Sequence, residues 1–477
     1  MYFRSTLIAV ACTSLLAGCL GNNGGDSSST TSAPKNVIFF LGDGMGINTL
    51  TAARIYKVGE DGDLTIDTLP ETDFVKTYSI NAQVTDSAPS MAAYMTGVKM
   101  NNEVISMTPE TSAFNLTTGA SYLNGTDSTC PASGNGTPVT TLLELAKAAG
   151  WGTGAVTTTR VTHATPATTY SHICHRDAEN NIAAQAVPGG VGYNTALGDG
   201  LDVLLGGGRQ FFLPTSVGGK RTDSRDLTAE LTAKGYTYVT NKTQFDAAAA
   251  SSTKKLVGLF TNSHMSYDID RDPAVEPSLA EMTTKAIDIL AKNKKGFFLM
   301  VEGGRIDHAL HETTAKKALQ DTVAFDDAIK AAIDKMKASD ANLANTLIVV
   351  TADHDHTLVL NGYAQRTGAT TPANPGVLGL LKNFVTGVAN TDTGGNPFTI
   401  IGFGNGENRP ATRTALTDAQ VSDKTYHQEA VVPMAAGSET HGGTDVFLGA
   451  IGLGAERFTG VITNTEVFNM IRQSVGL

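Results

Sequence analysis

Residues 36–46 read NVIFFLGDGMG. The first part of this stretch, residues 37–41, is apolar throughout, which is typical of a strand buried on both faces. A glycine-rich turn that carries Asp43 follows directly. A strand buried in this way needs helices on both of its sides. The stretch therefore favours an α/β protein built on a parallel central sheet.

Five further apolar runs of the same character follow along the chain. They are residues 153–156, 201–205, 297–301, 347–350 and 398–401. Helical periods separate them, the clearest at residues 316–336, where apolar side chains recur at three- and four-residue steps. The alternation predicts a mostly parallel central sheet flanked by helices on both faces, within one catalytic domain over residues 35–477. Two stretches rich in Gly, Thr and Asn, near residues 108–140 and 361–430, are expected to be loop-rich insertions on this frame.

The N-terminal residues predict export. Arg4 precedes an apolar run at residues 7–16 that is too short to span a bilayer. The run ends in Leu-Ala-Gly-Cys, which resembles a bacterial lipobox. We therefore expect a signal peptide at residues 1–18, a lipid on Cys19 and a flexible tether over residues 19–34. The protein would then lie in the periplasm or cell envelope, with this anchor as its one membrane contact. An ordinary signal peptide with an incidental cysteine is the alternative.

Charge and cysteine content narrow the choice of partners. The 477-residue chain has a formal net charge of -11, which argues against a nucleic-acid partner. With Cys12 removed and Cys19 lipidated, only Cys130 and Cys174 remain. In an oxidising compartment these two residues could pair. Two free thiols are the alternative, and the sequence leaves both open.

Acids, imidazoles and a hydroxyl follow four of the predicted strands. They are Asp43, His163, Thr165, Glu302, Asp353 and His354. A single acid after a strand more often caps a helix than binds a metal. Four such strand ends on one frame instead favour a shared site, because ligands of open α/β sheets bind outside the carboxyl ends of the strands.

Further imidazoles complete a candidate metal site. Asp307 and His311 are four residues apart, so on a helix they would project from one face. His441 lies in SETHGG, where small neighbours allow a close approach to a ligand. Carboxylate and imidazole without thiolate suit Zn²⁺ in a catalytic site, whereas a set of oxygens suits Mg²⁺. His356, two residues after His354, is expected to support a ligand or to belong to the core.

Ser87 is the candidate nucleophile. It lies in QVTDSAPSMAAYMTG, where Pro89 is tolerated in a first helical turn and the following residues are typical of a helix. Ser87 would then stand at a helix N-terminus, where free amides and the helix dipole favour an anion. A serine that only caps the helix is the alternative. No histidine lies near in sequence, but a zinc ion could lower the pKa of the hydroxyl instead.

Six blocks of the chain together resemble the alkaline phosphatase family, in that family's order and across nearly the whole mature chain. The blocks are NVIFFLGDGMG, TDSAPSMAAYMTGVK, THATPA, GFFLMVEGGRIDHALH, TADHDH and ETHGG. The resemblance implies a hydrolase of phosphate monoesters that works at alkaline pH through a phosphoserine on Ser87. It also implies a homodimer.

The resemblance assigns residues to three metal sites. It implies that Asp307, His311 and His441 bind the zinc that activates the attacking water. It gives a second zinc, which holds the serine oxygen, the ligands Asp43, Asp353 and His354. It gives magnesium the ligands Asp43, Thr165 and Glu302. Arg176 matches the family's substrate-binding arginine, whose guanidinium fork suits two phosphate oxygens.

Some positions depart from the family's bacterial pattern. His163 stands where some bacterial members carry Asp, and His308 stands where those members carry Lys. A neutral imidazole at residue 163 removes one negative charge, so the magnesium site would bind its ion more loosely or prefer another metal. We expect His163, His308 and His356 to lie behind the metal ligands and to support them without binding a metal themselves. Residues 361–430 match the family poorly.

Three rival functions are weighed against this one, the first being another hydrolase on the same frame, either a sulfatase or a phosphodiesterase. A sulfatase would need Arg in a Cys/Ser-x-Pro-x-Arg setting, and Met91 stands at that place after Ser87. A phosphodiesterase on the same frame would usually carry a Thr nucleophile and lack a match to Arg176. A surface lipoprotein that only binds phosphate or metal would not need Ser87 at a helix start. A purely structural protein does not explain the joint order of the blocks.

Overall fold

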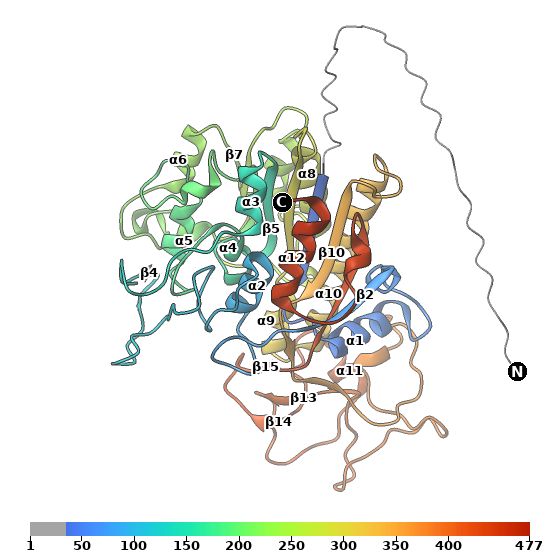
Figure 1. The fold of residues 1–477 in the computed structure, drawn as a ribbon. Helices are drawn as coiled ribbons and strands as arrows, with labels where there is room; N and C mark the ends of the chain where they lie inside the picture. The colour runs from blue at the N-terminus through green and yellow to red at the C-terminus, as the bar shows by residue number, and fades with distance from the viewer. Residues whose placement is uncertain (1–34) are drawn as a thin grey trace, which may run out of the picture. The chain divides into compact units, whose positions relative to one another are not determined.

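A ten-stranded sheet forms the centre of the fold (Figure 1). The computed structural model describes residues 35–477, so the signal peptide, Cys19 and the tether expected before them lie outside the described residues. From one edge to the other, the strands are β17 (Gly460–Thr463), β2 (Glu71–Lys76), β16 (Val446–Gly452), β10 (Thr346–Ala352), β1 (Lys35–Gly42), β9 (Gly296–Gly303), β5 (Gly152–Arg160), β6 (Val203–Gly207), β8 (Leu256–Leu259) and β7 (Thr237–Val239).

The sheet is mostly parallel, which confirms the predicted fold class. Every neighbouring pair from β10 across to β7 is parallel. Only β16 runs the other way, antiparallel to both β10 and β2. Five of the six predicted strand runs fall in this sheet. The sixth, residues 398–401, contributes only Ile401, which begins β13 (Ile401–Gly406) in a separate sheet with β12 (Leu358–Leu360) and β14 (Ala430–Pro433).

Helices cover both faces of the sheet. Those of the main frame are α1 (Ile47–Val58), α2 (Ser87–Thr96), α3 (Leu142–Ala148), α4 (Ala164–Tyr170), α8 (Leu279–Leu290), α9 (Arg305–His311), α10 (Ala315–Lys337) and α12 (Asn464–Val475). Shorter helices are α5 (Glu179–Gln185), α6 (Leu227–Ala233), α7 (Lys242–Ala247) and α11 (Asp418–Val421). The helix predicted at residues 316–336 corresponds to α10, and its apolar stripe is buried.

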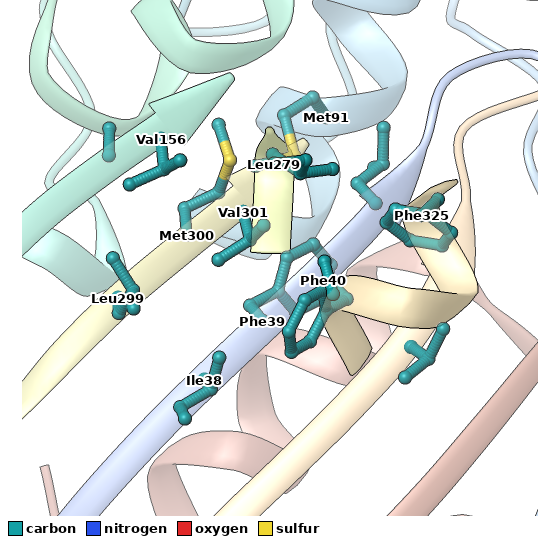
Figure 2. Packing of buried hydrophobic residues seen from close by; sticks show 14 of the residues in the cluster. Ile38, Phe39, Phe40, Met91, Val156, Leu279, Leu299, Met300, Val301 and Phe325 are labelled. Carbon is teal, nitrogen blue, oxygen red and sulfur yellow. The ribbon is translucent and has the colours of Figure 1, made fainter. Parts of the chain in front are cut away.

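Two consecutive residues of β1 join the two faces. The ring of Phe39 lies 5.6 Å from that of Tyr94 on α2, and the ring of Phe40 lies 5.9 Å from that of Phe325 on α10. Successive side chains of a strand point to opposite faces, so α2 and α10 cover opposite sides of the sheet. Figure 2 shows Phe39, Phe40 and Phe325 among the packed side chains of this core. All four rings are buried, and each contributes roughly 1.5–3 kcal/mol of hydrophobic stabilisation.

The two stretches expected as insertions carry little regular structure. Residues 108–140 contain the two-residue strands β3 (Leu123–Asn124) and β4 (Asp127–Ser128), with turns between. A disulfide joins Cys130 to Cys174, with 6.0 Å between their Cα atoms, and so ties this stretch to the segment after α4. In the second stretch, β13 and α11 lie below the central sheet in the view of Figure 1. Within the described residues, no helix has the length and apolar character needed to cross a membrane.

Candidate metal centre

The carboxyl ends of β1, β9 and β10 bring three acids to one edge of the sheet. Asp43 follows β1, Glu302 is the penultimate residue of β9, and Asp353 follows β10. All three side chains are fully buried. Gly44 makes the turn after β1 with φ of +67°, a conformation that favours glycine. A Cβ atom at Gly44 would also lie 2.5 Å from Nε2 of His356, so the turn needs glycine for space as well.

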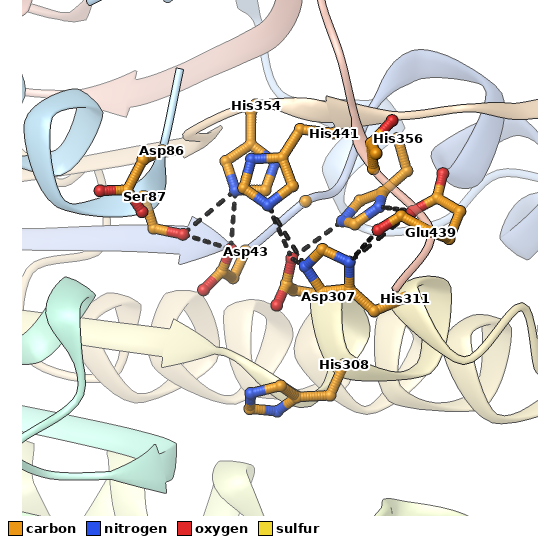
Figure 3. A network of polar contacts seen from close by, with 12 residues as sticks. Asp43, Asp86, Ser87, Asp307, His308, His311, His354, His356, Glu439 and His441 are labelled. Atoms are coloured by element: carbon orange, nitrogen blue, oxygen red, sulfur yellow. Dashed lines mark hydrogen bonds and ion pairs between the residues drawn. The ribbon is translucent and has the colours of Figure 1, made fainter. Parts of the chain in front are cut away.

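A first group joins one acid and three imidazoles. Its members are Asp307, His311, His356 and His441, and their possible ligand atoms lie within 4.8 Å of one another (Figure 3). Asp307 and His311 are one turn apart on α9, as their spacing predicted. His356 of β11 (Asp355–His356) is paired in register with His441 of β15 (His441–Gly442). Oδ1 of Asp307 lies 2.9 Å from Nε2 of His356 and 3.3 Å from Nε2 of His311.

A second group lies beside the first. Nε2 of His354 is 3.3 Å from Oδ1 of Asp43 and 3.5 Å from Oδ2 of Asp353. The ring of His354 stacks on that of His441, with centroids 3.5 Å apart and an interplanar angle of 13°. The three residues that the resemblance assigned to a second zinc are therefore together, next to the first group.

A third group forms on the other side of Asp43. Oδ2 of Asp43 accepts a hydrogen bond from the Thr165 hydroxyl at 3.4 Å. Asp43, Glu302 and His163 have possible ligand atoms within 4.8 Å of one another. His163 was expected to support this group from outside, but its ring is close enough to be a ligand itself. Glu302 in turn accepts hydrogen bonds from the hydroxyls of two threonines of β5, Thr157 and Thr159.

Burial and the neighbouring acids disfavour the ionised forms of these three carboxyl groups. Burial, followed by the charges of Asp307 and Glu302, raises the pKa of Asp43 well above its ordinary value. Burial raises the pKa of Glu302 to about 7, and burial together with Asp43 raises the pKa of Asp353 to about 8. Oε1 of Glu302 and Oδ2 of Asp353 are buried without any hydrogen-bond partner.

This arrangement fits divalent cations. Acids that repel one another in a buried site become favourable once a cation lies between them. The donors near Asp307 are carboxylate and imidazole, which suit zinc, and those near Glu302 include a hydroxyl, which suits a harder ion. The pKa of Asp307 behaves differently. Burial would raise it, but the imidazoles of His311 and His356 hold it well below its ordinary value.

Ser87 lies at the edge of the second group. It is the first residue of α2, and Asp86 is the N-cap. The Ser87 hydroxyl oxygen lies 3.1 Å from Nε2 of His354 and 3.5 Å from Oδ1 of Asp43. Arg176 is largely buried, and its guanidinium pairs with Asp86 and lies 3.0 Å from Nε2 of His163. The nucleophile candidate and the arginine are thus joined through Asp86.

Some residues around the site have positions that the sequence did not indicate. His308, expected in a support role, joins none of the three groups. It lies 2.9 Å from Arg305, and its ring centroid is 4.1 Å from that of His264. His264 had no recognisable motif around it. Glu439 contacts both His356 and His311. In the sequence, only its place two residues before His441 could have indicated that it lies near the site.

Comparison with known proteins gives one consistent result. The family model described as alkaline phosphatase matches residues 34–477. The rat tissue-nonspecific alkaline phosphatase is 37% identical over 462 residues, covering 90% of this chain and 82% of its own. The membrane-bound alkaline phosphatase of Bombyx mori is 35% identical over 472 residues, covering 91% of this chain and 78% of its own. A solved variant of the alkaline phosphatase of the Antarctic bacterium TAB5, with Mg bound, has a TM-score of 0.63 and 25% identity, covering 93% of this chain and 98% of that one.

Proposed function

Since this chain belongs to the alkaline phosphatase family, it is a phosphoric monoester hydrolase, and we propose that it works through a covalent phosphoserine on Ser87. The position of the Ser87 hydroxyl carries this proposal. It stands at the N-terminus of α2, 3.1 Å from His354 and 3.5 Å from Asp43. A serine that served only as a helix cap would not need two metal-binding side chains within reach.

The three groups of side chains would hold three ions. Asp307, His311 and His441 would bind one zinc, and Asp43, Asp353 and His354 would bind the second. Asp43, Thr165 and Glu302 would bind magnesium, with His163 as a further donor. When bound, these ions would neutralise the phosphate oxygens and lower the pKa values of the serine hydroxyl and of a water. The unpartnered oxygens of Glu302 and Asp353 support the assignment.

The chain's own residues would then divide the work. The Ser87 hydroxyl gives its proton to water as its oxygen attacks phosphorus, a new O–P bond forms, and the bond from phosphorus to the alcohol oxygen breaks. The alcohol takes up a proton from water as it leaves. A water molecule next attacks phosphorus on the side opposite the Ser87 oxygen, the bond between phosphorus and the Ser87 oxygen breaks, and one proton of that water passes to Ser87 as inorganic phosphate is released. Arg176 would bind two non-bridging phosphate oxygens in both steps, which fixes the phosphorus in line with the attacking atom.

Assembly and location form a separate part of the proposal. We infer a homodimer, as the family resemblance implies, and an exported protein held to the cell envelope by a lipid on Cys19. Metabolic labelling with a radioactive fatty acid tests the anchor. Label in the wild type that disappears with Cys19→Ser supports it, and an unlabelled wild type contradicts it. Size-exclusion chromatography with light scattering of the protein from residue 35 onward tests the dimer.

Hydrolysis of p-nitrophenyl phosphate at alkaline pH tests the reaction. We expect activity that disappears with Ser87→Ala or after treatment with EDTA, and that returns to the stripped wild type with Zn²⁺. Acid quenching during turnover should trap phosphate on Ser87, detectable by mass spectrometry. Ser474→Ala is a matched control, because its buried hydroxyl lies on α12 and donates to the carbonyls of Gly454 and Met470, which are not part of the site. Turnover of the bis-ester or the sulfate ester in preference to the monoester would overturn the substrate assignment.

A further inference from the structure

Glu439 is a buried acid that contacts the first metal group without belonging to it. It is 1% exposed and lies just before β15. Oε2 of its carboxylate lies 2.5 Å from Nδ1 of His356, and Oε1 accepts a hydrogen bond from the backbone N–H of Thr357 at 2.7 Å. The Thr357 hydroxyl donates to the same Oε1 atom. The carboxylate is therefore held rigidly, with three donors around it.

The backbone of Glu439 makes a second connection to the same group. Its carbonyl oxygen accepts a hydrogen bond from Nδ1 of His311, and its N–H donates to the His311 carbonyl at 3.2 Å. Glu439 thus contacts one imidazole through its side chain and another through its main chain (Figure 3). These two imidazoles come from α9 and β11, which are more than forty residues apart in the sequence.

The consequence concerns which ring nitrogens face the site. Nδ1 is occupied in all three imidazoles of the first group: by Glu439 in His311 and His356, and by the Thr85 carbonyl at 2.8 Å in His441. The Nε2 atoms therefore turn toward Asp307. A hydrogen bond at one ring nitrogen fixes both the orientation and the tautomer of a metal-binding histidine. Glu439 supplies two of these three bonds.

His356 extends the effect to the acid of the group. Its ring bridges Glu439 and Asp307, with Nδ1 on one carboxylate and Nε2 on Oδ1 of the other at 2.9 Å. Without His356, Oδ1 of Asp307 would keep only its longer contacts with Nε2 of His311 at 3.3 Å and Nε2 of His441 at 3.7 Å. The chain Glu439–His356–Asp307 therefore fixes the carboxylate, and the Glu439 carbonyl fixes the neighbouring ligand.

We propose that Glu439 is a positioning residue whose carboxylate, acting through His356, arranges Asp307 for zinc binding. This inference rests on the proposed function, because it assumes that the first group holds zinc. It goes further in naming a residue outside the three ligand sets on which the affinity of one particular zinc ion depends. Such outer hydrogen-bond partners typically contribute about 10- to 100-fold to metal affinity.

Zinc affinity, measured apart from activity, tests the proposal. The wild type, Glu439→Gln, Glu439→Asp and Glu144→Gln are stripped of metal and titrated with Zn²⁺ against a chromogenic chelator, and the melting temperature of each metal-free protein is recorded. Glu144→Gln is the matched control. It removes another buried acid that bonds an imidazole, His172 at 2.7 Å, and a helix N-cap, Thr141 at 2.8 Å, neither of which belongs to the three groups.

We expect Glu439→Gln to weaken one of the two zinc sites by about 10- to 100-fold and leave the other near the wild-type value. Glu439→Asp keeps the charge but is one methylene shorter, so it should weaken the same site to an intermediate degree. Glu144→Gln should lower the melting temperature and bind zinc as the wild type does. Its comparison with Glu439→Gln separates positioning from general stability, even if both variants melt earlier.

Two results would overturn the inference. They differ in whether the proposed assignment of zinc to the first group also fails. If the wild type binds two zinc ions and Glu439→Gln binds both equally well, Glu439 does not position the ligands and the proposed function stands. If the wild type binds no zinc and hydrolyses monoesters without it, the assignment of zinc to the first group fails and this inference fails with it.

Discussion

Nη2 of Arg176 lies 3.0 Å from Nε2 of His163. The residue proposed to bind phosphate is thus in contact with a candidate ligand of the third metal group. The other arm of the guanidinium pairs with Asp86, the N-cap of the helix that begins at Ser87. Arg176 is therefore oriented by the third group on one side and by the nucleophile helix on the other, before any substrate is present.

Replacing Arg176 should weaken substrate binding. Arg176→Ala removes two charge-assisted bonds to phosphate, each contributing about 1.5–3 kcal/mol, so we expect kcat/KM to fall by at least about 100-fold. Affinity for inorganic phosphate as a competitive inhibitor should fall in parallel. Arg54→Ala is the control, because Arg54 pairs with Asp67 away from the site. An unchanged inhibition constant for phosphate in Arg176→Ala would remove Arg176 from the phosphate site.

Exchanging His163 for an acid should tighten magnesium binding. His163→Asp adds a negative charge beside Asp43 and Glu302, whose possible ligand atoms lie within 4.8 Å of the His163 ring. Affinity of oxygen sites for hard cations rises with the number of charged ligands, so the Mg²⁺ concentration for half-maximal activation should fall by roughly tenfold. Without magnesium, the added repulsion should lower the melting temperature. An unchanged Mg²⁺ dependence would exclude residue 163 from the third group.

A buried acid outside the site should make stability depend on pH. Burial, with the charge of Asp268 as the next cause, raises the pKa of Asp321 to about 8. The folded protein then holds this proton up to about pH 8, whereas the unfolded chain releases it near pH 4. Stability contributed by the protonated form is therefore complete below pH 4 and is lost as pH rises towards 8, by up to roughly 1.4 kcal/mol per pH unit.

Asp321→Asn should remove this dependence. In metal-free protein, the free energy of unfolding of the variant minus that of the wild type should increase from pH 5.5 to about 8 and stay level above it. Asp334→Asn, on the exposed side of α10, should give a flat difference. A flat difference for Asp321→Asn as well would show that Asp321 is already ionised in the folded protein at pH 5.5.

The disulfide should stabilise the fold more than it supports the reaction. Cys130 and Cys174 are 44 residues apart, a separation for which loop closure predicts about 4 kcal/mol of stability. The Cys130→Ser/Cys174→Ser double variant should therefore unfold at lower denaturant concentration than the oxidised wild type. Dithiothreitol should destabilise the wild type to a similar extent and leave the double variant unaffected.

Activity per folded molecule should survive loss of the disulfide. The segment before Arg176 is also held by paired backbone hydrogen bonds between Ile105 and Ile173, and the Arg176 N–H donates to the Glu103 carbonyl at 2.8 Å. A KM for p-nitrophenyl phosphate that rose sharply in the double variant would instead make the disulfide part of the phosphate site.

The sequence predicted best those strands and helices whose own residues determine their type. The central runs of β1, β9 and β10 are apolar throughout, so the type and the burial of these strands followed from composition alone, and α10 followed from its periodicity. The run at residues 398–401 misled because a short apolar run predicts burial but not which sheet provides it. Only the partners of Ile401, namely β12 and β14, place it outside the central sheet.

The candidate site was predictable to the extent that it follows strand ends. Asp43, Glu302 and Asp353 meet because parallel neighbouring strands end at one edge. Residues that act through long-range contacts had no comparable signal. Glu439 and His264 belong to irregular segments. The places of the Glu439 carboxylate and the His264 ring near the site therefore depend on the whole fold. The pairing of the two cysteines depended in the same way on a distance that the sequence does not contain.

The alternation of Phe39 and Phe40 between the two faces of the sheet has a consequence for how this protein can change over evolution. A substitution in β1 that keeps an apolar side chain of similar volume leaves both helical layers in place. Deleting or inserting one residue would exchange the two faces and turn Asp43 away from its partners. We therefore expect homologous chains to exchange residues 37–41 for other apolar residues of similar volume and to keep the number of residues between Lys35 and Asp43 constant.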